Sequence, residues 1–473
     1  MTQTRTTLTT VGAVHGHADG DVWAFLGIPY AAPPVGERRF APPAAASPWT
    51  GVREADAFGP AAPQPDRPIG LWFHGPTPAT CEDCLSLNVW TPAPDDGEAR
   101  PVLVWIHGGG WALGFSGSPL FHGARLAAAL DAVVVTINYR LGSLGWLNHP
   151  QLAGGSGARA ANWGLQDMAV ALAWVRDNAA AFGGDPAAIT VYGQSAGAGS
   201  VLHLLTSPLV EGLFVRAIVQ SPPAGELVVP NERGHEWASA LSAHVGGAAE
   251  PLDLDALRAA PAEAIVAAHE ALLAQPAFRG TRGGAMPVVD PATIPVDPRR
   301  APTARLDIPV LIGTTADEGT FLFRAAGRDV NPDDDTLRAM VAHLPDVGDG
   351  EAADALIAAR REAGETDNGA ILCAAATQQL FAGPTDEWTA ARAAAGGTVF
   401  PYRVEHRSSD ERLGAVHTID VSLVFGSYEH EVGARVAGNT PGSARVSAAM
   451  VSAWRAFVHG EPPWSAGERH VFG

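Results

Sequence analysis

Short apolar runs rich in β-branched residues recur along the chain, and they constrain its fold more than any other feature. Runs of this kind are typical of strands that a parallel sheet buries on both faces. Segments between them carry apolar residues at helical spacing, as connections between parallel strands usually do. The runs lie at residues 101–106, 132–139, 187–193, 214–221, 308–315 and 398–404. The pattern predicts an α/β protein with a large, mostly parallel central sheet and helices on both of its faces.

The remaining segments complete this architecture. Residues 1–40 alternate apolar and polar side chains around an Asp-Gly pair at 19–20, which indicates an antiparallel hairpin at the N-terminal edge of the sheet. Residues 162–182 have helical spacing and end at Gly183, a residue suited to a helix C-cap. No internal repeat is present. We expect one domain over residues 1–473, with helical insertions at about 225–305 and 325–395.

The charge composition excludes several classes of enzyme. The chain has 31 cationic residues and no lysine, so every one of them is an arginine. Schiff-base and pyridoxal-phosphate lysines, P-loop lysines and Ser-x-x-Lys nucleophiles are therefore excluded. The formal net charge of −19 argues against nucleic acid or an anionic membrane as a partner. A neutral or cationic small molecule is compatible with this charge.

The cellular location can also be predicted from composition. No run of about 18 apolar residues is present, and residues 1–10 lack the charged and then apolar pattern of a secretory signal. The three cysteines, Cys81, Cys84 and Cys373, are an odd number that suits a reducing compartment. Cys81 and Cys84 lack the second pair that a zinc site would need. We expect a cytoplasmic protein that is a monomer or a weak homo-oligomer.

The segment Gly-Gln-Ser-Ala-Gly at residues 193–197 is the first candidate for chemistry. It fits the G-x-S-x-G pattern, in which small residues flank a serine at a sharp turn between a strand and a helix. The apolar run before it and the helical spacing after it supply that context. We interpret Ser195 as a nucleophile, and the alternative is a Gly/Ser turn without function.

A serine nucleophile also needs hydrogen-bond donors for the oxyanion that forms when it attacks a carbonyl. The segment His-Gly-Gly-Gly-Trp at 107–111 follows a predicted strand, and its glycines let backbone N–H groups approach a developing negative charge. We expect the N–H groups of Gly109, Gly110 and Ala196 to be these donors. The alternative is a flexible turn, for which three consecutive glycines would be entropically costly.

The residues alone leave the base and its orienting acid open. The base should lie in a loop after a late strand, and His406, His417 and His430 all meet this condition. Asp317 and Glu318 both follow a predicted strand at an end suited to a partner of the base. Spacing does not choose among them.

Segments along nearly the whole chain resemble the type B carboxylesterase family, which includes the para-nitrobenzyl esterases and cholinesterases of the α/β-hydrolase fold. The resemblance covers, in order, residues 27–43, 82–90, 105–111, 138–146, 162–168, 181–198, 315–323 and 414–426. It implies an α/β-hydrolase fold and a serine carboxylesterase that needs no metal or organic cofactor.

The resemblance also selects the partners of Ser195. In that family the base lies in a Gly-Ala-x-His segment ahead of Val-Phe-Gly, which implies His417. The Asp-Glu-Gly pattern implies Glu318 as the acid. The order Ser195, Glu318, His417 is the one expected for this fold.

Other matches imply scaffold roles. Arg39 with Glu82, and Arg140 with Asp167, match positions that form buried ion pairs in similar enzymes. Ser221 resembles a serine near the triad acid, and the alternative is an ordinary hydroxyl at the end of a strand.

Three positions depart from the family pattern. Gln194 stands where many relatives carry glutamate, which argues against a preference for choline esters. Cys84 keeps its family position, but the region around Gln64 lacks the distant cysteine of secreted relatives, so their long disulfide loop cannot form. Trp72 is equally suited to lining the substrate gorge and to packing.

We expect a small-molecule substrate, an aryl or short-to-medium alkyl ester. Large apolar side chains beside the catalytic loops are candidates for its pocket, although each also suits core packing: Trp111, Phe115, Phe321, Phe323, Leu423 and Phe425. Two alternatives remain. One is an amidase, carbamate hydrolase or lactonase with the same triad, and the other is a non-catalytic interaction module of the same fold.

Overall fold

A 12-stranded sheet forms the centre of the computed structural model, which describes residues 3–473 apart from 95, 154–160, 279–283 and 349. The strand order is β1-β2-β3-β5-β7-β6-β8-β9-β10-β11-β12, and β4 pairs with β2. All six predicted runs are strands, and they lie side by side in parallel: β6 (Arg100–Ile106), β7 (Val133–Ile137), β8 (Gly184–Gln194), β9 (Arg216–Gln220), β10 (Val310–Thr315) and β11 (Val399–Val404). The predicted mostly parallel α/β sheet is confirmed.

The N-terminal edge of the sheet is antiparallel, as the Asp-Gly signal predicts. The turn between β2 and β3 contains Gly20 at a φ of 61°. The edge also contains strands that the sequence patterns did not single out, among them β1, β4 and β5. Its members are β1 (Thr4–Thr9), β2 (Gly12–Asp19), β3 (Val22–Pro29), β4 (Val52–Glu54) and β5 (Ser86–Thr91). At the opposite edge, β12 (His470–Phe472) pairs with β11.

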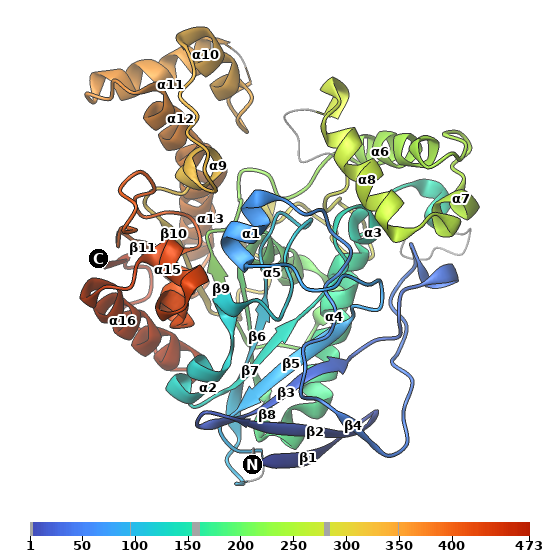
Figure 1. Ribbon diagram of the computed structural model, residues 1–473. Helices are drawn as coiled ribbons and strands as arrows, with labels where there is room; N and C mark the ends of the chain where they lie inside the picture. Colours follow the sequence, from blue (N-terminus) through green and yellow to red (C-terminus); the bar gives the residue numbers. More distant parts are fainter. Residues whose placement is uncertain (1–2, 95, 154–160, 279–283, 349) are drawn as a thin grey trace.

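Helices cover both faces of the sheet (Figure 1). Alternate residues of β6 show this directly, because Val102 and Val104 belong to one core and Leu103 and Trp105 to another. The first core includes α4 (Trp163–Asn178) and α5 (Ala196–Thr206). The second includes α2 (Ala124–Leu130), α14 (Ile419–Val424), α15 (Glu431–Ala437) and α16 (Pro441–Val458). The apolar runs lack strict alternation because both faces of these strands are buried.

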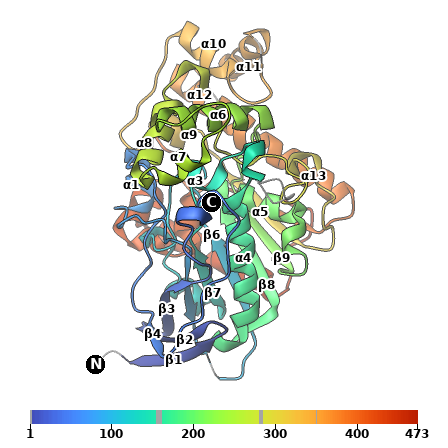
Figure 2. The same cartoon turned by 90° about the vertical axis from the view of Figure 1, so that its right-hand side faces the viewer.

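Two groups of helices rise beyond the carboxyl ends of the parallel strands, on either side of the short helix α1 (Pro68–His74) in Figure 1. The turned view in Figure 2 shows both groups at one end of the molecule and the β1–β2 hairpin at the other. Between β9 and β10 lie α6 (Asn231–His244), α7 (Leu254–Ala259) and α8 (Ala262–Leu273). Between β10 and β11 lie α9 (Thr320–Arg324), α10 (Asp334–Ala342), α11 (Gly350–Glu362) and α12 (Asn368–Ala376), which form the other group, and α13 (Gly383–Ala394), which packs against β10 and β11. None of the described helices is long and apolar enough to cross a bilayer.

Two ion pairs predicted to be buried are present in the scaffold. The Nη2 atom of Arg140 lies 2.7 Å from Oδ1 of Asp167, and their side chains are 4% and 0% exposed. The Nε atom of Arg39 lies 2.7 Å from Oε1 of Glu82. The guanidinium of Arg39 also donates to three backbone carbonyls at residues 257, 258 and 260, around the end of α7. One arginine therefore connects an N-terminal loop to the α6–α8 group.

Replacing Arg39 with methionine is expected to lower the free energy of unfolding by about 3 kcal/mol, because Glu82 and three carbonyls would lose a partner inside the protein. Urea denaturation measures this loss. Asp354→Ala is a control, since it breaks an exposed pair with Arg338 and should cost far less stability. Equal losses in the two variants would contradict the structural role of Arg39.

Candidate active site

Ser195 stands in a strained turn between β8 and α5. Its φ of 55° and ψ of −124° lie in a region that L-residues rarely adopt. The neighbouring glycines make the turn possible. A Cβ atom on Gly193 would lie 2.4 Å from the carbonyl oxygen of Gly197, and one on Gly197 would lie 2.1 Å from that of Ile106. The G-x-S-x-G spacing is therefore required by close backbone contacts at this turn.

The glycine loop that follows β6 presents backbone N–H groups beside Ser195. Gly109 and Gly110 have φ angles of 120° and 64°, and a Cβ atom on Gly109 would lie 2.1 Å from the carbonyl oxygen of Leu113. Within the described part of the chain, the N–H groups of Gly109, Gly110 and Ala196 have no protein acceptor. Ala196 is the first residue of α5, where a helix leaves its N–H groups unpaired. These donors are available to an anion formed at the serine.

His417 and Glu318 form a buried pair. The Nδ1 atom of His417 lies 2.5 Å from Oε2 of Glu318, and the side chains are 2% and 0% exposed. The other carboxylate oxygen accepts the backbone N–H of Thr315 at 2.7 Å. The rings of Phe321 and Phe381 flank the imidazole at centroid distances of 5.0 Å and 4.9 Å. Because the carboxylate accepts from Nδ1, the neutral ring carries its proton there and leaves a lone pair on Nε2.

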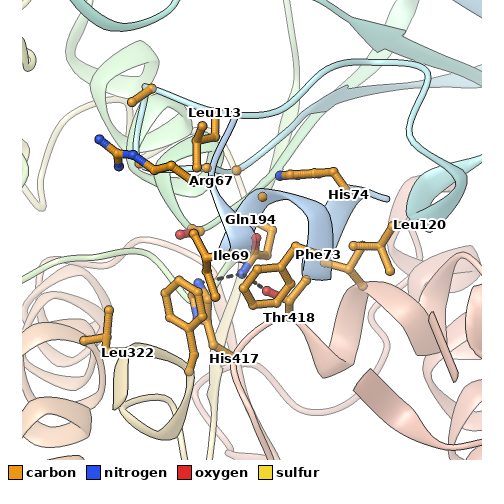
Figure 3. Close-up of a pocket in the computed structure, with 18 of the residues that line it drawn as sticks. Arg67, Ile69, Phe73, His74, Leu113, Leu120, Gln194, Leu322, His417 and Thr418 are labelled. Carbon is orange, nitrogen blue, oxygen red and sulfur yellow. Dashed lines mark hydrogen bonds between the residues drawn. The ribbon is translucent and has the colours of Figure 1, made fainter. Parts of the chain in front are cut away.

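The Nε2 atom of His417 faces the cavity, where Gln194 is its hydrogen-bond partner. The side-chain nitrogen of Gln194 lies 2.9 Å from Nε2 of His417 and 3.2 Å from Oγ1 of Thr418, and Figure 3 shows the three side chains converging. Among the described residues, no hydrogen bond joins the hydroxyl of Ser195 to His417. Both residues line the same cavity. Catalytic hydrogen bonds are often long before substrate binds, so the lack of this bond does not argue against the pair.

The other candidates for base and acid lie away from the cavity lining. Asp317 accepts the backbone N–H of Ala415 at 2.8 Å. His406 contacts the hydroxyl of Ser443 at 3.2 Å, and His430 caps the N-terminus of α15. The structure thus brings together the histidine and the acid that the family resemblance selects, and it gives the other three residues local structural contacts.

The cavity beside Ser195 has a volume of about 250 Å³ and is mostly apolar. Its wall comes from α1, the glycine loop, residues 119–121, α8, α9, the segment before α13 and α14. Arg67 brings one guanidinium to this wall, but both nitrogen atoms that face Glu270 are paired with its carboxylate. The apolar residues of the lining include Ile69, Phe73, Leu113, Leu120, Phe121, Leu273, Phe321, Leu322, Phe381 and Val421.

Two further histidines give the wall neutral polar groups. Burial, together with the neighbouring His107, lowers the pKa of His74 to about 3. Burial lowers the pKa of His269 to about 4, and Nδ1 of its ring lies 2.9 Å from the hydroxyl of Ser143. Nδ1 of His74 has no hydrogen-bond partner among the described residues. Both rings are uncharged at neutral pH, so this wall presents no free cation to a substrate.

Of the six residues predicted to line the pocket, one lies on the cavity wall. Phe321 lies on the cavity wall and stacks on His417. The other five pack elsewhere: Trp111 in the core with α4 and α5, Phe115 against His74, Leu423 and Phe425 in the core with α2 and α16, and Phe323 against the α10–α12 core. Trp72 also lies outside the lining and packs against Phe73. A position next to a catalytic loop in sequence does not fix the direction in which its side chain points.

The cysteines and Gln64 have structural surroundings. Cys81, Cys84 and Cys373 are all free. The side chain of Gln64 exchanges two hydrogen bonds with the backbone of Gly114, at 2.9 Å and 2.8 Å, and so anchors the loop before α1. Within the described ranges, no cluster of histidine, cysteine or acidic side chains is arranged to hold a metal ion.

A doubly covered, mostly parallel sheet with a serine at a strand-to-helix turn, at the carboxyl ends of the strands, defines an α/β-hydrolase. Residues 3–471 match the sequence model of the Carboxylesterase family, and the chain belongs to this family. It is a serine-type carboxylic ester hydrolase.

Known relatives agree with this assignment. Phenmedipham hydrolase of Pseudarthrobacter oxydans is 38% identical over 466 residues, covering 96% of this chain and 90% of the relative. Para-nitrobenzyl esterase of Bacillus subtilis (strain 168) is 39% identical over 338 residues, covering 71% and 67%. A solved structure of PNB esterase superposes with a TM-score of 0.84 at 32% identity, covering 99% of this chain and 96% of the other. A carboxylesterase of Geobacillus stearothermophilus gives 0.83 at 33% identity, with the same coverage.

Proposed function

We propose that Ser195 is the nucleophile, His417 the general base and Glu318 the acid that orients it. The observation that carries this assignment is the buried 2.5 Å contact between Nδ1 of His417 and Glu318, on the wall of the cavity that Ser195 also lines. The strained turn at Ser195 supports it, because strain of this kind is concentrated at functional sites. The N–H groups of Gly109, Gly110 and Ala196 are the proposed oxyanion donors.

In the acylation half of the reaction, Nε2 of His417 takes the hydroxyl proton while Oγ of Ser195 attacks the ester carbonyl. The carbonyl π electrons move to oxygen, and the three backbone N–H groups stabilise the resulting oxyanion. Glu318 stabilises the imidazolium without taking its proton. When the tetrahedral intermediate collapses, His417 gives this proton to the leaving alkoxide, and an acyl-serine and a free alcohol remain.

Deacylation repeats these steps with water. Nε2 of His417 accepts a proton from water as the oxygen attacks the acyl carbon, and the same donors stabilise the second oxyanion. Collapse of this intermediate breaks the bond to Oγ of Ser195, which recovers the proton from His417. The acid product leaves, and the enzyme returns to its starting protonation state.

The cavity supports uncharged aryl or short-to-medium alkyl esters as the substrates. Its wall is mostly apolar, its two extra histidines are neutral, and its arginine is paired with Glu270. An apolar cavity of roughly 150 Å³ can admit benzene. A volume of about 250 Å³ therefore has room for one aromatic ring and a short acyl chain.

A panel of p-nitrophenyl esters tests this proposal. We expect kcat/KM to be highest for acetate or butanoate and to fall for octanoate and further for palmitate, because the longer chains exceed the cavity. Release of p-nitrophenol measures each rate, and a choline ester of matched acyl length serves as the charged comparison. A preference for palmitate, or for the choline ester, would contradict the proposed substrate class.

A carbamate is the second candidate substrate. The observation that favours it is a relative named phenmedipham hydrolase, which covers 96% of this chain. Amides and lactones could react through the same groups, since the same oxyanion forms in each case. The p-nitrophenyl panel extends to aryl carbamates, anilides and lactones of matched size. A carbamate kcat/KM above that of the ester would make carbamate hydrolysis the main activity.

We also propose that the enzyme works in the cytoplasm as a monomer or weak homo-oligomer. The three free cysteines support a reducing compartment. Cell fractionation tests the location, and sedimentation velocity over a range of protein concentrations tests the oligomeric state.

A further inference from the structure

The side chain of Gln194 occupies the proton-accepting side of the proposed base. This residue ends β8, immediately before Ser195, and is only 4% exposed. Its amide nitrogen lies 2.9 Å from Nε2 of His417 and 3.2 Å from Oγ1 of Thr418. In Figure 3 the amide of Gln194 lies between His417 and Thr418, among the side chains that line the cavity. An amide in this position can influence the protonation of the imidazole.

An amide and a carboxylate would act in opposite ways at this position. Nδ1 of His417 is used by Glu318, so Nε2 of the neutral ring carries only a lone pair. The N–H of Gln194 can donate to this lone pair, and a hydrogen bond to the neutral form favours that form. A glutamate could not donate. Its negative charge would instead stabilise the imidazolium.

The other groups around His417 make its contact with Gln194 important for the protonation of the imidazole. Glu318 lies against Nδ1, and the buried carboxyl group of Asp420 is close enough to interact electrostatically with both Glu318 and His417. Glu318 favours the imidazolium, and Asp420, whose pKa burial raises to about 7, does so when it is ionised. Phe321 and Phe381 flank the ring and carry no charge, the histidines across the cavity are neutral, and Arg67 is paired with Glu270. Among the described residues, Gln194 is therefore the group on the Nε2 side that opposes the effect of Glu318.

We propose that Gln194 is a positioning residue for the base: its amide holds His417 as a neutral imidazole, with Nε2 free of a proton, until the hydroxyl of Ser195 takes over that lone pair. This inference rests on the proposed role of His417. It follows that the resting enzyme keeps its base active at a lower pH than a glutamate at position 194 would allow. When the hydroxyl of Ser195 approaches Nε2 of His417, it replaces the amide of Gln194 there. The hydrogen bonds of Gln194 and Ser195 to His417 therefore do not need to exist at the same time.

The pH dependence of kcat/KM tests the proposal. The acid limb reports the titration of the base in the free enzyme. Gln194→Glu is expected to move the midpoint of this limb upward by about 1–3 pH units, the usual effect of an opposite charge at contact distance. Gln194→Met keeps the length of the side chain but cannot donate, so its midpoint should also rise, by less. Gln378→Glu makes the same chemical change at an exposed position outside the cavity lining and should leave the midpoint unchanged.

A second measurement separates this proposal from the esterase assignment. NMR titration of the His417 imidazole, identified by its loss in His417→Phe, is made in Ser195→Ala with and without Gln194→Glu. A higher pKa for His417 in the double variant supports the proposal even if no ester is hydrolysed, in which case the proposed catalytic role fails alone. Equal pKa values in the two proteins, or an acid limb that both Gln194 substitutions leave in place, would overturn the role of Gln194.

Discussion

Replacement of Ser195 by alanine is expected to lower kcat for p-nitrophenyl acetate by at least about 10³, because the remaining cavity offers only binding and oxyanion donors. The fold should survive. The hydroxyl of Ser195 makes no hydrogen bond to the proposed base among the described residues, so its removal breaks no structural contact there. Single-turnover kinetics measure the loss, and the midpoint of thermal unfolding reports on the fold. A kcat near that of the wild type would reject the nucleophile assignment.

Ser221 provides a matched control for this substitution. It directly follows the neighbouring strand β9, has a φ of 49°, and carries a buried hydroxyl with no partner among the described residues. Ser221→Ala is the same change at a second serine with a positive φ, and we expect it to retain most of the activity. A loss comparable to that of Ser195→Ala would instead give Ser221 a role in supporting Glu318. An organophosphate should add its mass at Ser195 in the wild type and in Ser221→Ala, but not in Ser195→Ala.

Features that depend on local backbone requirements could be predicted from the sequence. The parallel strands are recognisable because burial on both faces leaves continuous apolar runs, as in β6 and β7. The turn at Ser195 is recognisable because a side chain at Gly193 or Gly197 would meet backbone atoms, which leaves glycine as the residue that fits. Strands β1 and β12 carry weaker signals because they lie at the edges of the sheet, and in the interior strand β5 the polar residues Ser86, Asn88 and Thr91 interrupt the apolar run.

The cavity wall could not be predicted in the same way. Its members come from segments far apart in the chain, such as Phe73 in α1, Leu273 in α8 and Phe381 before α13. Their sequence signal is that of ordinary helix packing, and only the tertiary arrangement turns these side chains toward Ser195. The contact between Gln194 and His417 joins residues 223 positions apart. Its partners were both recognised from the motifs, but their meeting depends on the sheet order.

Asp420, the buried acid next to His417 and Glu318, leads to the second prediction, which concerns how stability depends on pH. Asp420 is fully buried in α14, and its carboxyl group accepts the hydroxyl of Tyr402 at 3.2 Å. Burial first, and then the negative charge of Glu318, raise the pKa of Asp420 to about 7. In the unfolded chain an aspartate ionises near its ordinary value of about 3.9. The folded protein therefore holds a neutral carboxyl group over a pH range in which the unfolded chain is ionised.

The sign of the pH dependence follows from this difference. Because the folded pKa is the higher one, the stability linked to Asp420 is fully present below about pH 4 and is lost as the pH rises through about 7. A difference of about three pKa units corresponds to about 4 kcal/mol. Asp420→Asn has nearly the same shape, can still accept from Tyr402 and cannot ionise. We therefore expect it to be more stable than the wild type by up to about 4 kcal/mol at pH 8 and nearly equal to it at pH 4.

Urea denaturation at several pH values between 4 and 8 measures this difference. Asp354→Asn, an exposed position on α11, serves as the control and should show no comparable gain at high pH. If Asp420→Asn were no more stable than the wild type at pH 8, the carboxylate would have to be ionised and fully compensated in the folded state. An Asp420 that is always ionised would place a second negative charge beside Glu318. The base would then need the neutral partner on its Nε2 side even more, because two buried carboxylates would favour the imidazolium at every pH of the assay.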